Sequence, residues 1–205
     1  MKRLGNYEIL LHPHDHKNKR DWLRILSFLD KNLDFTKISS SLELGAGMGN
    51  IAFHILKRNP QAQVICEDIN PEYLKIITQR NPKIEILLHD INKPLPFENE
   101  RFDLVSCIGT LHYGYVKDPE KVLGEMARVS KKYIFVDFFS KYSLFSFFER
   151  IYYPKYSSRR FTASEIRSLI KRLALKEVAK IGTRTIFPRL FPFSGKAVLF
   201  LLKKL

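Results

Sequence analysis

The sequence predicts an α/β fold, in which a doubly wound, mostly parallel sheet carries helices on both faces. Three observations lead to this prediction. Short apolar segments alternate with helix-like segments along residues 40–140, a pattern that implies right-handed crossovers between parallel strands. A glycine-rich turn joins the first apolar segment to the helix-like segment that follows it. The 205 residues, 45% of them hydrophobic, are enough for the core of one such sheet.

The first predicted strand, at residues 41–44, runs into a G-x-G-x-G turn at residues 45–49, and a helix pattern follows from Ile51. Glycines at this spacing allow a sharp turn and let a ligand approach the backbone without meeting a Cβ. The start of the helix adds unpaired N–H groups and a positive dipole end. A dinucleotide fingerprint needs its third glycine at the position of Asn50, but here the glycine comes one residue early, at Gly49.

Four more strands and their helices complete this part of the chain. Two of the strands end in an acid, at Asp68 and at Asp90, and the first of these lies where a nucleoside ribose needs carboxylate acceptors. Asn70 and Pro71 predict a helix start, as the capping residue and the first helical residue. The strands are expected at residues 63–68, 84–90, 102–109 and 133–139, and a helix at residues 121–130.

The C-terminal third supplies the last elements of the fold. Thr162 and Glu165 have the spacing of a capping box, and they precede an amphipathic helix at residues 166–173. Residues 177–186 and 196–204 then predict two strands joined by a proline-rich turn. At the other end of the chain, residues 21–29 are expected to form a helix that includes Trp22.

Residues 40–140 as a whole resemble the class I S-adenosylmethionine-dependent methyltransferases. The glycine turn after Glu43, the two acids and the segment 111–129 carry the resemblance, and that segment resembles the small-molecule, type 11-like branch. The resemblance implies a seven-stranded sheet of order 3-2-1-4-5-7-6, with strand 7 antiparallel and the ligand over the switch point between strands 1 and 4. It also implies S-adenosyl-L-methionine as the cofactor and an enzyme that transfers its methyl group. In this family a helix such as residues 21–29 commonly lies over the cofactor cleft, so the resemblance implies that Trp22 packs there.

The resemblance carries the family's cofactor-binding roles onto ten positions. The glycines shape the loop, Asp68 binds the ribose hydroxyls, Asp90 with Ile91 lies at the adenine, Glu43 lies beneath the loop, and Ile108 lines the floor. The full set is Glu43, Gly45, Ala46, Gly47, Gly49, Asp68, Ile69, Asp90, Ile91 and Ile108. Three alternatives stay open. The glycine loop could bind another nucleotide or be only a tight turn. Glu67 could bind the ribose in place of Asp68, and Asp90 could cap the turn that follows its strand.

His112 and Tyr113 are the candidates for a catalytic base or a substrate contact, because both follow the predicted fourth strand. The pKa of a histidine suits proton transfer near neutral pH. The alternative is that both residues only shape the pocket. The family often has histidine where Tyr113 stands, and a Lys-Pro-Gly-Gly turn where this chain has residues 130–133.

The expected organisation is one methyltransferase domain over residues 1–205. It divides into an N-terminal helix region at residues 1–38, a cofactor-binding core at 39–139, a substrate lid at 140–161, and a closing helix and hairpin at 162–205. The sequence shows no signal peptide and no apolar segment long enough to span a bilayer.

Most of the net charge of +14 lies in the C-terminal third. Residues 141–205 hold 15 basic and 3 acidic side chains, and the lid region alternates cations with aromatic rings. This composition favours a small-molecule or lipid-like acceptor that is anionic or aromatic. RNA is the alternative, since bases stack on aromatic rings and phosphates pair with cations. A basic surface with no such partner, or a binding module that has lost turnover, would also fit.

The histidines and cysteines do not indicate a metal site. His12, His14 and His16 could converge only in extended backbone, cations follow them, and methyl transfer from a sulfonium needs no metal. Cys66 and Cys107 lie inside apolar strand patterns and are expected to be buried and free. We therefore expect no metal and a reducing, cytoplasmic environment.

Overall fold

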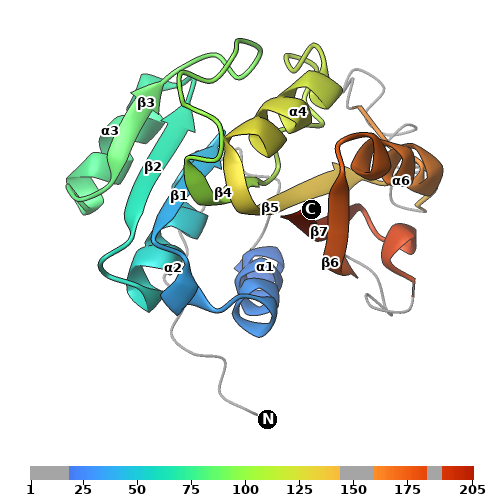
Figure 1. Ribbon diagram of the computed structural model, residues 1–205, viewed down its shortest axis with the longest axis horizontal. Coiled ribbons are helices and arrows are strands. Elements are labelled where there is room, and N and C mark those ends of the chain that lie inside the picture. The colour runs from blue at the N-terminus through green and yellow to red at the C-terminus, as the bar shows by residue number, and fades with distance from the viewer. Residues whose placement is uncertain (1–18, 144–158, 184–190) are drawn as a thin grey trace.

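The computed structural model describes residues 19–143, 159–183 and 191–205, which include one seven-stranded sheet of order β3-β2-β1-β4-β5-β7-β6 (Figure 1). The strands are β1 (Ser40–Leu44), β2 (Gln63–Asp68), β3 (Glu85–Leu88), β4 (Phe102–Cys107), β5 (Ser130–Phe139), β6 (Leu175–Gly182) and β7 (Ala197–Lys204). Strands β1 to β5 pair in parallel, and β7 runs antiparallel to both β5 and β6. The fold class and the strand order that the sequence predicted are confirmed.

Helices cover both faces of the sheet, and each face has its own apolar layer (Figure 1). The helices are α1 (Lys19–Asn32), α2 (Asn50–Arg58), α3 (Pro71–Arg80), α4 (Pro119–Val129) and α6 (Ala163–Arg172), with short 3-10 turns at Phe35–Lys37 and Pro192–Ser194. Side chains of α1, α2 and α3 pack on one face, and those of α4 and α6 pack on the other. Successive residues of β5 alternate between the layers, with Ile134 and Val136 in one and Phe135 in the other.

The predicted helix caps form as the sequence indicated. The Asn70 side chain accepts a hydrogen bond from the Glu72 backbone N–H, and Pro71 is the first residue of α3. Thr162 and Glu165 form the reciprocal capping box at the start of α6. These caps satisfy backbone donors that would otherwise lack a partner at the helix starts.

Several element boundaries differ from the predicted ones. Strand β5 begins at Ser130, directly after α4, because the chain turns into the strand without the expected loop. Strand β6 begins at Leu175, after Ala174 with a φ of +50° reverses the chain at the end of α6. Strand β3 is confined to four residues at the sheet edge.

Some predicted segments lie outside the described residues. They are the histidines His12, His14 and His16, the lid residues 144–158 and the end of the predicted strand at residues 184–186. Within the described part of the chain, no helix is long and apolar enough to cross a membrane.

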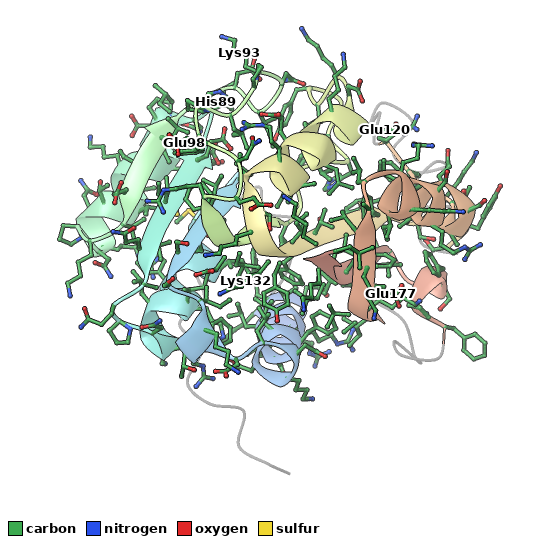
Figure 2. The ribbon with its side chains drawn as sticks, in the orientation of Figure 1. His89, Lys93, Glu98, Glu120, Lys132 and Glu177 are labelled. Carbon is green, nitrogen blue, oxygen red and sulfur yellow. The ribbon has the colours of Figure 1, made fainter. Side chains whose placement is uncertain are left out.

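A buried carboxylate ties the amino ends of β1 and β4 together. Asp103 accepts hydrogen bonds from the Ser39 N–H and hydroxyl, at 2.9 and 2.5 Å, and from the Ser40 N–H at 3.3 Å. Its other oxygen lies 2.8 Å from the ammonium of Lys132, a residue that is labelled in Figure 2. Burial by itself would raise the pKa of Asp103, but the hydrogen bonds from Lys132 and Ser39 outweigh it and lower the pKa to about 2. The native state therefore favours the ionised carboxylate.

We expect Asp103→Asn to lower the free energy of unfolding by about 2 kcal/mol at neutral pH, the equivalent of the pKa shift from 3.8. A lowered folded-state pKa stabilises the protein above the unfolded-state value, and this stabilisation disappears as the pH falls through the folded-state value. The difference between the two proteins should therefore shrink between about pH 4 and pH 2. Denaturant unfolding across this range tests the prediction, with Glu98→Gln at an exposed position as the control. A difference that does not change with pH would contradict it.

Candidate active site

A cavity of about 370 Å³ opens at the carboxyl ends of β1, β2, β4 and β5. This is the edge of the sheet where ligands bind in doubly wound folds, over the switch point between β1 and β4. Loops after these strands, the first turn of α1 and the β6–β7 hairpin contribute its walls. The lining residues are Asp21, Trp22, Gly45, Ala46, Gly47, Met48, Asn50, Asp68, Ile69, Asn70, Tyr73, Ile108, Gly109, Thr110, His112, Tyr113, Tyr115, Phe139, Thr183, Lys196 and Ala197.

The glycine loop forms one wall of the cavity, and two of its positions require glycine. Gly45 has a φ of +58°, and a Cβ there would lie 2.3 Å from the Thr110 hydroxyl. Gly47 has a φ of +52°, and no atom lies within 4 Å of its Cβ position. Substitution at Gly45 is thus blocked by protein atoms. At Gly47 the space beside the backbone is left open for a ligand.

Two carboxylates at the end of β2 hold this loop in place. Glu67 accepts a hydrogen bond from the Gly45 N–H at 3.0 Å, and Asp68 accepts one from the Gly47 N–H at 2.8 Å. The second oxygen of Asp68 accepts from the Asn70 N–H at 2.9 Å. Asp68 lines the cavity, and each of its oxygens keeps a further lone pair for a ligand.

Glu43 lies beneath the loop, where the resemblance places it, but its side chain binds backbone N–H groups at the start of α2. Its carboxyl oxygens accept from the Ile51 and Ala52 N–H groups at 3.3 and 2.8 Å, in the first turn of that helix. Burial raises the pKa of Glu43 to about 8, although these hydrogen bonds act in the opposite direction. The residue does not line the cavity, so the structure gives it the role of fixing the helix behind the glycine loop.

A smaller hollow adjoins the cavity on the side of β3. It is lined by Gly45, Glu67, Asp68, Ile69, Asp90, Ile91, Thr110 and Tyr115, five of which also line the cavity. Asp90 accepts hydrogen bonds from the backbone and side-chain N–H groups of Asn92, which lower its pKa. Asp90 therefore closes the turn that follows β3, and it borders the hollow as well.

Glu67 forms the inner wall of the hollow. Burial raises the pKa of Glu67 to about 8, and the Gly45 N–H acts in the opposite direction. The ring of His89, labelled in Figure 2, places its Nδ1 atom 3.9 Å from Glu67, too far for a hydrogen bond. Both acids considered for the ribose thus contact the loop, but of the two only Asp68 lines the larger cavity.

Aromatic rings line the cavity beyond the ends of β4 and β5. His112 stacks on Phe139, with ring centroids 3.5 Å apart and an angle of 12° between the planes. Tyr113 lies 4.4 Å from His112, and Tyr115 stacks on Tyr113 at 5.6 Å. The two predicted catalytic candidates are therefore part of a continuous aromatic wall.

The structure brings most of the predicted site residues together. Gly45, Ala46, Gly47, Asp68, Ile69, Ile108, His112 and Tyr113 line the cavity, and Asp90 and Ile91 line the hollow beside it. Glu43 and Gly49 line neither. Gly49 instead packs against α3, with Ile77 3.1 Å from its Cβ position. Trp22 is buried in the cavity wall, as expected.

Sequence reasoning missed part of the lining. Thr110 and Tyr115 follow β4, next to residues that were predicted, so their position after a strand end could have indicated them. Thr183 and Lys196 come from the hairpin, and no local motif marks them.

Comparison with known proteins supports the resemblance. Residues 42–133 match the family model described as a methyltransferase domain. Among similar solved structures is a possible histamine N-methyltransferase from Thermotoga maritima, with 19% identity, a TM-score of 0.66 and coverage of 90% of this chain and 89% of that one. Magnesium protoporphyrin IX methyltransferase from Synechocystis PCC 6803, with bound S-adenosylhomocysteine, has 12% identity, a TM-score of 0.71 and coverage of 91% and 83%.

A third similar structure is an S-adenosylmethionine-dependent methyltransferase from Clostridium acetobutylicum, with 15% identity, a TM-score of 0.69 and coverage of 90% of this chain and 92% of that one. At these identities the structures establish a shared fold. The chain therefore contains a methyltransferase domain over residues 42–133, and its strand order and glycine loop are those of the class I S-adenosylmethionine-dependent methyltransferase fold.

Proposed function

We propose that the protein transfers the methyl group of S-adenosylmethionine to a small-molecule or lipid-like acceptor that is anionic or aromatic. One observation carries this proposal: a single cavity reaches from the glycine loop to the aromatic wall of His112, Tyr113 and Phe139. The cofactor and a flat acceptor can therefore lie side by side in one cavity, which methyl transfer requires.

The residues at the loop fit the cofactor chemically. The open space at Gly47 admits a ligand against the backbone, and Asp68 offers carboxylate oxygens for ribose hydroxyls. Asp90 and Ile91 border the adjoining hollow of about 10 Å³, and they offer an acceptor and an apolar surface to the edge of an adenine held in the main cavity. When bound, the cofactor supplies a methyl group already activated by its sulfonium.

The protein's part in the reaction is to align the acceptor and exclude water. Such alignment can lower the barrier by roughly 7 to 11 kcal/mol in favourable cases. With the cofactor bound, a lone pair of the acceptor would form the new bond to the methyl carbon while the bond from sulfur to that carbon breaks, and the acceptor's proton would leave. His112, which is buried in the cavity wall, is the candidate to take that proton, and with Tyr113 it holds the acceptor ring.

Ion pairs on the basic C-terminal third argue for a small acceptor over RNA. Arg172 pairs with Glu120 at 2.6 Å, and Lys204 pairs with Glu100 at 2.8 Å. Lys180 pairs with Glu177 at 2.8 Å, so these described cations already face carboxylates of the same chain. A phosphate-binding surface instead presents its cations to the nucleic acid. Cys66 and Cys107 are buried and form no disulfide in the described part of the chain, which suits the reducing cytoplasm that we propose for this enzyme.

We expect Asp68→Asn to weaken binding of S-adenosylhomocysteine by about 1 to 3 kcal/mol, the range for loss of a charge-assisted hydrogen bond. The asparagine side chain keeps one oxygen that can accept the hydrogen bond from the Gly47 N–H, so the glycine loop should stay in place. Calorimetric titration measures the change, with Glu98→Gln as the control at an exposed acid.

A 2′-deoxy analogue of the ligand separates a ribose contact from a loosened loop. The wild-type protein should bind S-adenosylhomocysteine more tightly than the 2′-deoxy analogue, and Asp68→Asn should remove this difference in affinity. An unchanged preference in the folded variant would show that another residue holds the ribose.

Methyl transfer itself can be followed with a cofactor labelled in the methyl group. We expect label from the wild-type protein to enter small organic acids of a metabolite extract and to leave bulk tRNA unlabelled. His112→Ala, which opens the aromatic wall, should abolish the labelling while S-adenosylhomocysteine still binds. Label found in RNA would favour the alternative acceptor, and label in neither fraction would favour a binding module without turnover.

A further inference from the structure

We propose that Lys196 selects the acceptor by binding an anionic substituent, a carboxylate or a phosphate, on a planar aromatic ring. This inference rests on the proposed function and names the acceptor class of the same cavity. Lys196 comes directly before β7, at the hairpin that closes the sheet, and it lines the cavity together with His112 and Phe139.

The backbone of Lys196 is fixed from two sides, so its side chain starts from a defined position. Its N–H donates to the Thr183 carbonyl oxygen at 3.0 Å, and its own carbonyl oxygen accepts from the Ser140 N–H at 3.0 Å. These bonds connect the end of β6 and the end of β5 through a single residue. A cation presented by a rigid backbone can impose the position of a bound anion.

The ammonium of Lys196 lies beside the aromatic wall. Its Nζ atom is 5.1 Å from the centroid of the Phe139 ring, and that ring stacks on His112 at 3.5 Å. A positive charge at this distance interacts favourably with the face of a ring. A ligand ring that extends the stack would therefore have the ammonium within reach of a substituent at its edge.

Burial makes this cation suitable for recognition. Only 8% of Lys196 is exposed. An ion pair that this cation forms with a ligand in the cavity wall is stronger than one in water, because the effective dielectric constant there is lower. The carboxylates among the described lining residues, Asp21 and Asp68, come from α1 and the end of β2, whereas the hairpin part of the wall carries Lys196. The charges of the lining thus favour an anion near the hairpin.

The position of Lys196 favours a small acid over a nucleic acid. A polymer would be held mainly by cations outside the cavity, whereas this lysine lies in the cavity wall. A compact aromatic acid can pack its ring against the exposed part of the aromatic wall and direct its anionic group toward Nζ.

Matched acid and amide ligands test the proposal, because the two differ in charge and have nearly the same shape. The protein is first saturated with S-adenosylhomocysteine. We would then compare its affinity for benzoate, 4-hydroxybenzoate and indole-3-acetate with its affinity for the corresponding amides, and its affinity for phenyl phosphate with that for phenol. The wild-type protein should bind at least one anion about tenfold more tightly than its neutral partner. Lys196→Met, which keeps the length of the side chain, should remove this preference.

Lys203→Met is the matched control, since Lys203 lies on β7, the strand that Lys196 directly precedes, and is exposed. It should keep the wild-type preference, and all three proteins should bind S-adenosylhomocysteine equally. The proposal is overturned if the wild-type protein binds the anionic and the neutral ligand of every pair equally well, or if Lys196→Met retains the preference for the anion. Failure of the wild-type protein to bind S-adenosylhomocysteine would instead overturn the proposed function, so the two failures are distinguishable.

Discussion

Hydrogen bonds from backbone N–H groups to acidic side chains hold the glycine loop, and the rest of the site depends on them. Glu67 and Asp68 bind the loop from β2, while Glu43 binds the first turn of the helix behind it. Because β1 and β2 are paired in parallel, their carboxyl ends bring these acids under one turn. The left-handed glycines can then turn the chain sharply without losing their backbone partners.

This arrangement lowers stability while it organises the site. Burial raises the pKa values of Glu43 and Glu67 from 4.5 to about 8, so the folded protein retains protons that the unfolded chain releases. Raised carboxyl pKa values make stability fall as the pH increases from about 4.5 toward 8. Asp103 acts in the opposite sense at the other end of the sheet, where its lowered pKa stabilises the fold above pH 4. The carboxyl ends of the strands are thus arranged for ligands, and the amino ends for stability.

Local signals made the fold predictable, whereas the acceptor end of the cavity depends on distant parts of the chain. The helix caps at Asn70 and Thr162 depend only on residues close to them in the sequence, so they could be predicted. The alternation of strands and helices predicted the parallel part of the sheet. Lys196 reaches the cavity only because β7 inserts between β5 and β6, and no pattern around it indicates a site. The prediction that Asp68 binds the ribose remains a prediction, to which the structure adds its contact with Gly47.

Calorimetric titration of the purified protein with S-adenosylmethionine, S-adenosylhomocysteine and NAD most directly tests the central claim, that the glycine loop and its carboxylates form a cofactor site. We predict micromolar binding of the first two ligands and no binding of NAD, because the third glycine comes too early for a dinucleotide fingerprint. Binding of NAD, or of none of the three, would contradict the assignment of this cavity.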